Sequence, residues 1–292
     1  MTTAFVLSGG ASLGAIQVGM LEALYEREIA PDLVVGTSVG AVNGAFVATH
    51  EPTVEAAREL GGIWRRVRRS DVFPPSPVTG LIGFLGRGDH LVSERSLRRL
   101  ISRYVSVEGL EEARVPLHVI AAELVNGREV RLSRGSAVDA VMASAAIPGV
   151  FPPVEWRGRE LIDGGVVNNT PISHALELGA DEVYVLPTGY SCSLDHEPTS
   201  ALGILVQAMN LLVQQRLVLE VDVLRDRVPL FVLPPPCPQD VQPIDFGQAA
   251  MLIDRGRAEA RAFLDEVAAG TSVRGASRHV ERLRPHGHWS AA

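Results

Sequence analysis

A serine that could act as a nucleophile lies in the pentapeptide Gly36-Thr37-Ser38-Val39-Gly40. The apolar run Leu33-Val34-Val35 precedes it and the small-residue stretch 41–45 follows it, so the serine stands at a tight turn from strand to helix. Such a turn is a nucleophile elbow. Its glycines let neighbouring segments approach closely, while the strained backbone leaves the serine hydroxyl exposed. Ser38 is therefore the candidate nucleophile.

A glycine-rich loop near the N-terminus could stabilise negative charge. The segment Ser8-Gly9-Gly10-Ala11-Ser12-Leu13-Gly14 follows the strand-like residues 4–7 and opens an apolar helical stretch. Free N–H groups at a helix start can bind a developing oxyanion, and losing one such donor typically costs about 3 to 4 kcal/mol of transition-state stabilisation. We expect Gly9, Gly10 and Ala11 to form an oxyanion hole.

A carboxylate that could act as the base lies in Asp163-Gly164-Gly165, directly after the strand-like segment 160–162. The pair Thr170-Pro171 behind it suits the N-cap and first position of a helix. An exposed carboxylate is a weak base with a pKa of about 3.9, so catalysis by Asp163 requires partial burial and a short hydrogen bond to Ser38. The alternative is that Asp163 only holds a turn.

Together these elements resemble the patatin-like phospholipases, relatives of plant patatin and of cytosolic phospholipases. The shared features are a glycine-rich loop after the first strand, a Gly-x-Ser-x-Gly elbow after the second and a later Asp-Gly-Gly. The segment Ala143-Ser144-Ala145-Ala146-Ile147-Pro148-Gly149-Val150-Phe151-Pro152-Pro153 also looks like the stretch that these proteins carry before their aspartate. The resemblance covers residues 4 to about 190.

The resemblance implies a three-layer α/β fold and a Ser38–Asp163 dyad that cleaves lipid acyl esters through an acyl-enzyme. Gly36 and Gly40 would shape the elbow, and Gly164 and Gly165 the turn after the aspartate. The chain departs from the family at two positions of the glycine loop, because Ala11 replaces the third glycine and Leu13 replaces a basic residue. Ala11 still offers its N–H, but the cation is missing.

Other interpretations of these motifs stay open. A Ser-His-Asp triad would need an imidazole from His174 or from Asp195-His196, although in ordinary α/β-hydrolases the elbow follows several strands rather than two. A phosphate-binding loop at residues 8–14 would lack both common glycine spacings. Asn168 and Asn169 are interpreted as turn formers. Because no His, Cys, Asp or Glu pair has convincing metal-ligand spacing, we expect neither metal nor cofactor.

Composition narrows the classes of protein and their setting. The 292 residues carry a formal net charge of -7, which argues against general nucleic-acid binding. Cys192 and Cys237 are too few for a disulfide framework, so a reducing, cytoplasmic setting is the default expectation. The N-terminus lacks the basic region of a secretory signal. Residues 201–224 are apolar but interrupted by polar groups on one face, which favours a packed helix over a membrane span.

Strand and helix signals alternate along the first half of the chain, which predicts a mainly parallel sheet with helices on both faces. The hairpin signal Asn126-Gly127, between strands at 116–124 and 128–132, makes the sheet mixed. Further strands are expected at 4–7, 32–35, 182–186 and 230–233, helices at 13–27, 39–49, 53–69, 93–104, 136–146, 171–178, 200–222 and 247–267, and a loop at 71–90. We predict a single domain over residues 1–270 and a flexible tail over 271–292.

A basic cluster suggests peripheral membrane contact through residues 65–88. Four arginines, Arg65, Arg66, Arg68 and Arg69, precede a proline- and glycine-rich loop that carries apolar residues. Basic groups beside apolar ones suit docking at a lipid surface. Alternatively, the arginines complement a helix dipole and the loop folds over the core.

The leading function is therefore that of a serine lipid acyl hydrolase of phospholipase or esterase type. The alternatives are a serine esterase or acyltransferase that acts on soluble acyl groups with the same fold, and a catalytically silent lipid-binding protein. The oligomeric state and the headgroup, chain length and position of the ester are not encoded in these patterns.

Overall fold

The computed structural model describes residues 1–74, 90–189, 199, 201–237 and 241–270. The predicted tail 271–292 and most of the predicted loop 71–90 lie outside the described residues. The strands are β1 Thr3–Leu7, β2 Leu33–Thr37, β3 Leu117–Glu123, β4 Glu129–Leu132, β5 Val154–Trp156, β6 Arg159–Asp163, β7 Glu182–Leu186 and β8 Leu230–Val232. The α-helices are α1 Ala15–Tyr25, α2 Val39–Thr49, α3 Val54–Trp64, α4 Arg69–Val72, α6 Arg95–Tyr104, α7 Ala137–Ser144, α8 Gly165–Asn168, α9 Ile172–Glu177, α10 Ala201–Leu224 and α11 Ala249–Ala268, with short 3-10 helices at Ala11–Gly14 and Leu110–Glu112.

All of these strands belong to one mixed sheet, as predicted. Its order is β5-β6-β3-β2-β1-β7-β8, with β4 paired to β3. The strands β3, β2, β1, β7 and β8 run parallel, whereas β4 and β6 are antiparallel to β3, and β5 is antiparallel to β6. The Asn126-Gly127 hairpin is confirmed by the antiparallel register of β3 and β4.

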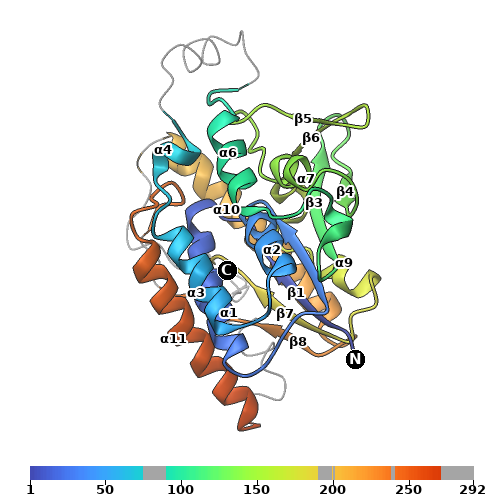
Figure 1. Cartoon of the computed structure of the whole chain (residues 1–292), viewed down its shortest axis with the longest axis vertical. Helices are drawn as coiled ribbons and strands as arrows, with labels where there is room; N and C mark the ends of the chain where they lie inside the picture. Colours follow the sequence, from blue (N-terminus) through green and yellow to red (C-terminus); the bar gives the residue numbers. More distant parts are fainter. Residues whose placement is uncertain (75–89, 190–198, 200, 238–240, 271–292) are drawn as a thin grey trace, which may run out of the picture.

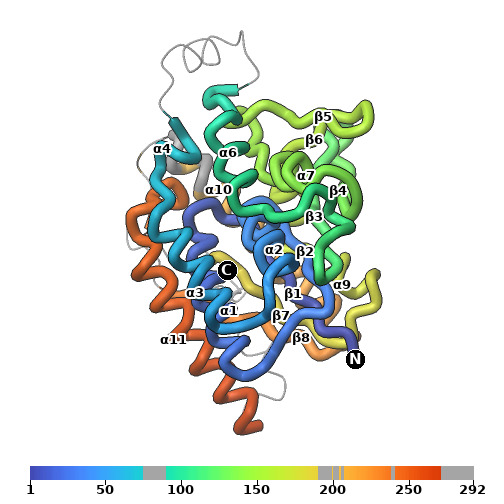
Figure 2. Tube along the Cα trace, in the orientation of Figure 1, coloured from blue at the N-terminus to red at the C-terminus, as the bar shows by residue number. Residues whose placement is uncertain are grey.

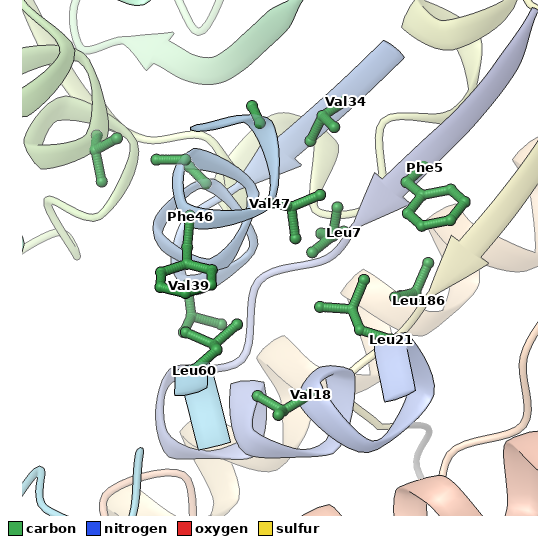
Figure 3. Packing of buried hydrophobic residues seen from close by; sticks show 14 of the residues in the cluster. Phe5, Leu7, Val18, Leu21, Val34, Val39, Phe46, Val47, Leu60 and Leu186 are labelled. Atoms are coloured by element: carbon green, nitrogen blue, oxygen red, sulfur yellow. The ribbon is translucent and has the colours of Figure 1, made fainter. Parts of the chain in front are cut away.

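One face of the sheet carries the larger part of the core. Alternate residues of the central strands, such as Phe5, Leu7 and Val34, point to this face and are fully buried. They pack against α1 and α2, and α3 and α11 lie against α1 on the outer side (Figure 1 and Figure 3). Burial of such side chains contributes about 1.5 to 3 kcal/mol each, so this layer holds the elbow helix α2 firmly.

The opposite face is covered by α9 and α10, which completes the three layers. Val6, Val35 and Val185 pack there against Ile172 of α9 and Val221 of α10. The expected helix over residues 201–224 is present as α10, but its buried face begins at Gln214, whereas apolar residues before it, such as Ile204 and Leu212, are exposed. Among the described helices, none is both long and apolar enough to cross a bilayer.

The structure differs from the sequence prediction in several local features. The helix expected over 53–69 ends at Trp64, and the short helix α4 follows within the region expected to start a loop. The strand-like segment 160–162 is part of β6, but β5 and helix α8 are too short for periodicity to reveal. Cys237 is disulfide-bonded, which differs from the reducing setting expected from the cysteine count.

Candidate active site

Strand pairing brings the candidate nucleophile and the candidate base together. On β3, Ile120 pairs with Thr37, the last residue of β2, and the next residue, Ala121, pairs with Asp163, the last residue of β6. Because β2 runs parallel and β6 antiparallel to β3, the two strands run toward each other and end at neighbouring positions. Ser38, which follows Thr37, therefore lies beside Asp163 despite a separation of 125 residues.

The two side chains share a hydrogen bond in a buried setting. Ser38 Oγ donates to Asp163 Oδ2 at 2.7 Å, and Asp163 Oδ1 accepts the N–H of Gly165 at 2.8 Å. Ser38 is 8% exposed and Asp163 is 6% exposed. Burial raises the pKa of Asp163 to about 6, although the hydrogen bonds from Ser38 and Gly165 act in the opposite direction. A carboxylate with a raised pKa is a stronger base than an exposed one.

The backbone at Ser38 is strained, as an elbow requires. Its φ is 55°, in the left-handed region that non-glycine residues rarely adopt. Gly40 is needed for the same turn, since a Cβ there would lie 2.1 Å from the carbonyl oxygen of Leu7. Helix α2 starts at Val39, so Ser38 lies at its positive N-terminal end.

A buried serine that the sequence interpretation did not single out holds the elbow in place. Ser144, at the end of α7, accepts the N–H of Ser38 at 2.8 Å and donates to the carbonyl oxygen of Ile120 at 2.5 Å. Its side chain is fully buried. One hydroxyl thus connects the nucleophile's own amide to β3, the strand that aligns both catalytic candidates.

The glycine loop is held by hydrogen bonds to two distant segments of the chain. Gly9 donates its N–H to the carbonyl oxygen of Asn169 at 3.1 Å, and its carbonyl oxygen accepts the Thr188 hydroxyl at 2.5 Å. A Cβ at Gly10 would lie 2.1 Å from Thr188 Oγ1, so glycine is required there. The N–H of Gly9 is therefore already engaged, which differs from the expectation that it faces an oxyanion.

Two N–H groups of the loop are available for a ligand. Within the part of the chain that the structure describes, the N–H groups of Gly10 and Ala11 have no hydrogen-bond acceptor. Ala11, with a φ of 50°, also lines the same cavity as Ser38. These two donors are the ones that an oxyanion beside Ser38 could use.

Two buried polar side chains behind the loop, Gln17 and Asn43, were also missed from the sequence. Gln17 donates to the carbonyl oxygens of Ser8 and Leu186, both at 2.9 Å. Asn43 donates to Gln17 at 2.8 Å and accepts from Trp64 at 3.0 Å. Because buried polar groups are costly unless paired, this chain of hydrogen bonds fixes the loop against α1, α2 and α3.

The loop after Asp163 is anchored to the opposite face of the sheet. Asn168 is fully buried and donates to Glu129 and Glu220, both at 3.2 Å, while its carbonyl oxygen accepts the Thr37 hydroxyl at 2.9 Å. Asn169 places its amide oxygen against Gly9, where a Cβ would lie only 2.4 Å from it. Both asparagines hold the turn, and both also join it to distant segments.

The histidines considered for a triad lie elsewhere or outside the described residues. His174 Nε2 contacts Glu129 at 2.7 Å, and its Nδ1 lies 3.6 Å from Glu177. Both ring nitrogens are thus engaged in a polar cluster on α9, while Ser38 contacts Asp163 directly. His196 falls outside the described residues.

An apolar cavity opens beside Ser38. Its volume is about 90 Å³, and its walls come from α2, α3, α6 and the segment after α7, with Phe46, Leu60, Leu100 and Phe151 among them. Ligand pockets for drug-sized molecules are typically about 300–1,000 Å³. The cavity therefore fits a short acyl chain, or the part of a longer chain nearest the ester carbonyl.

The comparisons with known proteins agree with the resemblance seen in the motifs. The sequence profile of the family described as patatin-like phospholipase matches residues 5–176, which is more than half of the chain. The match includes the glycine loop, the elbow and Asp163. The chain belongs to the patatin-like phospholipase family.

Curated relatives are much longer proteins. The chain is 28% identical over 205 residues to "Lysophospholipase nte1" of Aspergillus terreus, an alignment that covers 68% of this chain and 12% of that protein. It is 28% identical over 204 residues to "Patatin-like phospholipase domain-containing protein 6" of Mus musculus, covering 69% of this chain and 14% of that one. The chain thus spans about an eighth of the length of these relatives.

Solved structures include more distant neighbours. VipD from Legionella pneumophila aligns with a TM-score of 0.49 and 15% identity, over 91% of this chain and 67% of that one. Human GIVD cytosolic phospholipase A2 aligns with a TM-score of 0.44 and 11% identity, over 96% and 59% of the two chains.

Proposed function

We propose that this protein is a serine lipid acyl hydrolase that uses Ser38 and Asp163 as a catalytic dyad. The observation that carries the proposal is the buried 2.7 Å hydrogen bond from Ser38 Oγ to Asp163. It is supported by the strained elbow at Ser38 and by the raised pKa of Asp163. Family membership agrees with this chemistry.

The proposed reaction proceeds in two halves. Ser38 Oγ attacks the ester carbonyl carbon while Asp163 accepts its proton, and the resulting oxyanion binds the N–H groups of Gly10 and Ala11 near the start of α2. The tetrahedral species collapses to an acyl-enzyme on Ser38, and the alcohol leaves with the proton from Asp163. A water molecule, deprotonated by Asp163, then attacks the acyl-enzyme. When the bond from the acyl carbon to Ser38 Oγ breaks, Asp163 returns the proton to Ser38 and the fatty acid is released.

A lysophospholipid or phospholipid is the substrate class that we favour. Relatives that cover two thirds of this chain are named lysophospholipases. The apolar lining of the cavity beside Ser38 suits an acyl chain.

A short acyl ester in solution is the second candidate substrate, with an acyltransferase reaction as its variant. The observation in its favour is the cavity volume of about 90 Å³, which is small for a long chain. Turnover on phospholipid vesicles compared with short-chain p-nitrophenyl esters distinguishes the two candidates. A catalytically silent lipid-binding protein would turn over neither.

The dyad proposal predicts that Ser38→Ala and Asp163→Asn each reduce ester hydrolysis to near background, because each removes one partner of the proton transfer. Hydrolysis of p-nitrophenyl esters and labelling by a fluorophosphonate probe provide the measurements, and circular dichroism checks that both variants fold. Wild-type protein should be labelled at Ser38. If either variant retained most of the activity, the dyad would be excluded.

Membrane contact through residues 65–88 and a cytoplasmic setting remain predictions. Of this segment, only residues 65–74 belong to the described part, and they contain the four arginines next to α4. Co-sedimentation of wild type and Phe84→Asp with vesicles tests the contact.

A further inference from the structure

A second cavity, separate from the one at Ser38, lies between α3, α4 and the N-terminal turn of α11. Its volume is about 620 Å³. Three arginines, Arg65, Arg68 and Arg69, line it together with Asp245. Figure 2 shows α4 and the start of α11 on the same side of the molecule. We refer to this cavity as the arginine cleft.

Within the described part of the chain, the positive charge of the arginine cleft is not neutralised by ion pairs. Among the described residues, no carboxylate forms an ion pair with the guanidinium group of Arg65, Arg68 or Arg69. Asp245 is the one carboxylate among the described residues of the lining, and one of its oxygens accepts the N–H of Gly247 at 2.8 Å. The arginines thus outnumber the carboxylate by three to one, within a chain whose net charge is -7.

The backbone at the N-terminus of α11 also favours an anion in the arginine cleft. Helix α11 begins at Ala249, which lines the cleft with Ala250, and no side chain caps its N-terminus. The first N–H groups of a 20-residue helix therefore point toward a cavity already lined by guanidinium groups. Guanidinium groups bind phosphate through two parallel hydrogen bonds, which makes phosphate the anion that fits best.

The arginine cleft adjoins the apolar cavity that contains Ser38. Val67 and Phe246 line both cavities, so the two cavities share part of their walls. Phe246 stacks on Trp64 at 6.3 Å between ring centroids, and Trp64 also lines the apolar cavity. An apolar site and a cationic site thus lie next to each other, as an amphiphile with an anionic group requires.

We propose that the arginine cleft binds the phosphate of the lipid substrate and so makes the enzyme prefer phosphate-bearing esters over neutral ones. This inference rests on the proposed hydrolase function of Ser38. The acyl chain enters the apolar cavity beside Ser38, and the headgroup phosphate lies across Phe246 against Arg68 and Arg69. The contribution is to binding, so it acts on KM rather than on kcat.

The test compares two substrates with the same acyl chain, a lysophospholipid and a monoacylglycerol, each below its critical micelle concentration. In the double variant Arg68→Gln/Arg69→Gln, KM for the lysophospholipid should rise by about 10- to 100-fold, because charge-assisted hydrogen bonds are lost. Its kcat should stay within about twofold, and both constants for the monoacylglycerol should be unchanged. Equal effects on the two substrates, or none on either, would overturn the proposal.

Two control variants and a competition experiment with inorganic phosphate complete the test. Arg58→Gln removes an arginine of α3 that lies outside the cleft, so it should leave both substrates unaffected. Arg68→Lys/Arg69→Lys keeps the charge but loses the paired hydrogen bonds, so its KM for the lysophospholipid should lie between those of the wild type and the glutamine variant. Inorganic phosphate should compete with the lysophospholipid in the wild type but not in the glutamine variant. Equal inhibition of the two substrates by phosphate would place the ion at Ser38 rather than in the cleft, and binding of phosphate without competition against the lysophospholipid would mean that the cleft takes free phosphate rather than a headgroup; either result would overturn the proposal.

The same assays separate this inference from the proposed function. If the wild type hydrolyses the monoacylglycerol and reacts with a fluorophosphonate but does not prefer the lysophospholipid, the cleft proposal fails and the hydrolase stands. If Ser38 is unreactive and neither ester is cleaved, the hydrolase proposal itself fails.

Discussion

At the scale of single residues, opposing influences act on the pKa of Asp163. Its burial disfavours the charged carboxylate, while hydrogen bonds from Ser38 and Gly165 favour it, and burial prevails, with the pKa raised to about 6. A base of this strength is still ionised at neutral pH but accepts a proton more readily than a surface aspartate. The strength of the base thus follows from its position at the end of a buried strand.

This pKa predicts the acid side of the pH profile. Since the ionised carboxylate is the active form, kcat/KM should fall tenfold per pH unit below about pH 6 and be constant above it until another group titrates. Measurements of kcat/KM on a p-nitrophenyl ester between pH 4.5 and pH 8 would check this. Imidazole groups titrate in a similar range, so a histidine control is needed.

The control is His174→Gln, which removes the imidazole considered for a triad. Because His174 contacts Glu129 and not Ser38, the acid limb should keep its midpoint in this variant. A limb that disappears with His174 would instead assign the titrating group to a histidine and contradict the role of Asp163.

Motifs selected Ser38 and Asp163 as candidates from the sequence because local residue types define an elbow and a strand-ending aspartate. They did not reveal that Asn169 engages the N–H of Gly9, nor that Thr188 fixes the loop. These contacts join positions about 160 to 180 residues apart, and no local pattern encodes them.

At the scale of elements, α7 connects the elbow to the sheet. Its last residue, Ser144, bridges the Ser38 N–H and the Ile120 carbonyl oxygen. In Ser144→Ala both groups lose their partner, and a buried unsatisfied group costs about 1 to 3 kcal/mol. We expect kcat/KM to fall by about tenfold and the midpoint of thermal unfolding to decrease, as enzyme assays and calorimetry would show.

A matched substitution at the other end of the same helix separates the two effects. Ser136 caps α7 by accepting the N–H of Asp139 at 3.2 Å, so Ser136→Ala should cost about 1 kcal/mol of stability. Its kcat/KM should remain unchanged, since it does not touch the elbow. Equal kinetic defects in both variants would show that α7 acts only through stability.

At the scale of the whole molecule, alternating patterns were sufficient to predict a mixed sheet with helices on both faces. They were not sufficient to predict the order of the strands or the convergence of β2 and β6 on β3. That convergence depends on registers between distant segments, and β6 is only five residues long. The division into a domain over residues 1–270 and a tail stays a prediction.

The raised pKa of Asp163 also predicts how the free energy of unfolding depends on pH. Because the pKa of Asp163 is higher in the folded state than in the unfolded chain, the folded state binds more protons between about pH 4 and pH 6. Stability is therefore lost as the pH rises through this window. The rise in the pKa of Asp163 by about two units corresponds to at most about 2.7 kcal/mol of the free energy of unfolding.

Asp163→Asn removes this titration while keeping the shape of the side chain. Its free energy of unfolding should exceed that of the wild type at pH 8, and the difference should shrink toward pH 4, as urea titrations at both pH values would show. Ser38→Ala, which is equally inactive but keeps the carboxylate, should still lose stability as the pH rises. A variant Asp163→Asn that is less stable at pH 8 would contradict the burial argument.

The meeting of β2 and β6 on β3 also has a consequence for biosynthesis. A ribosome that has translated the glycine loop, the elbow and β3 has made a chain whose Ser38 still lacks its hydrogen-bond partner, because Asp163 belongs to a segment not yet translated. If the proposed dyad carries the activity, the emerging polypeptide cannot hydrolyse an ester until its later strands have been added and paired.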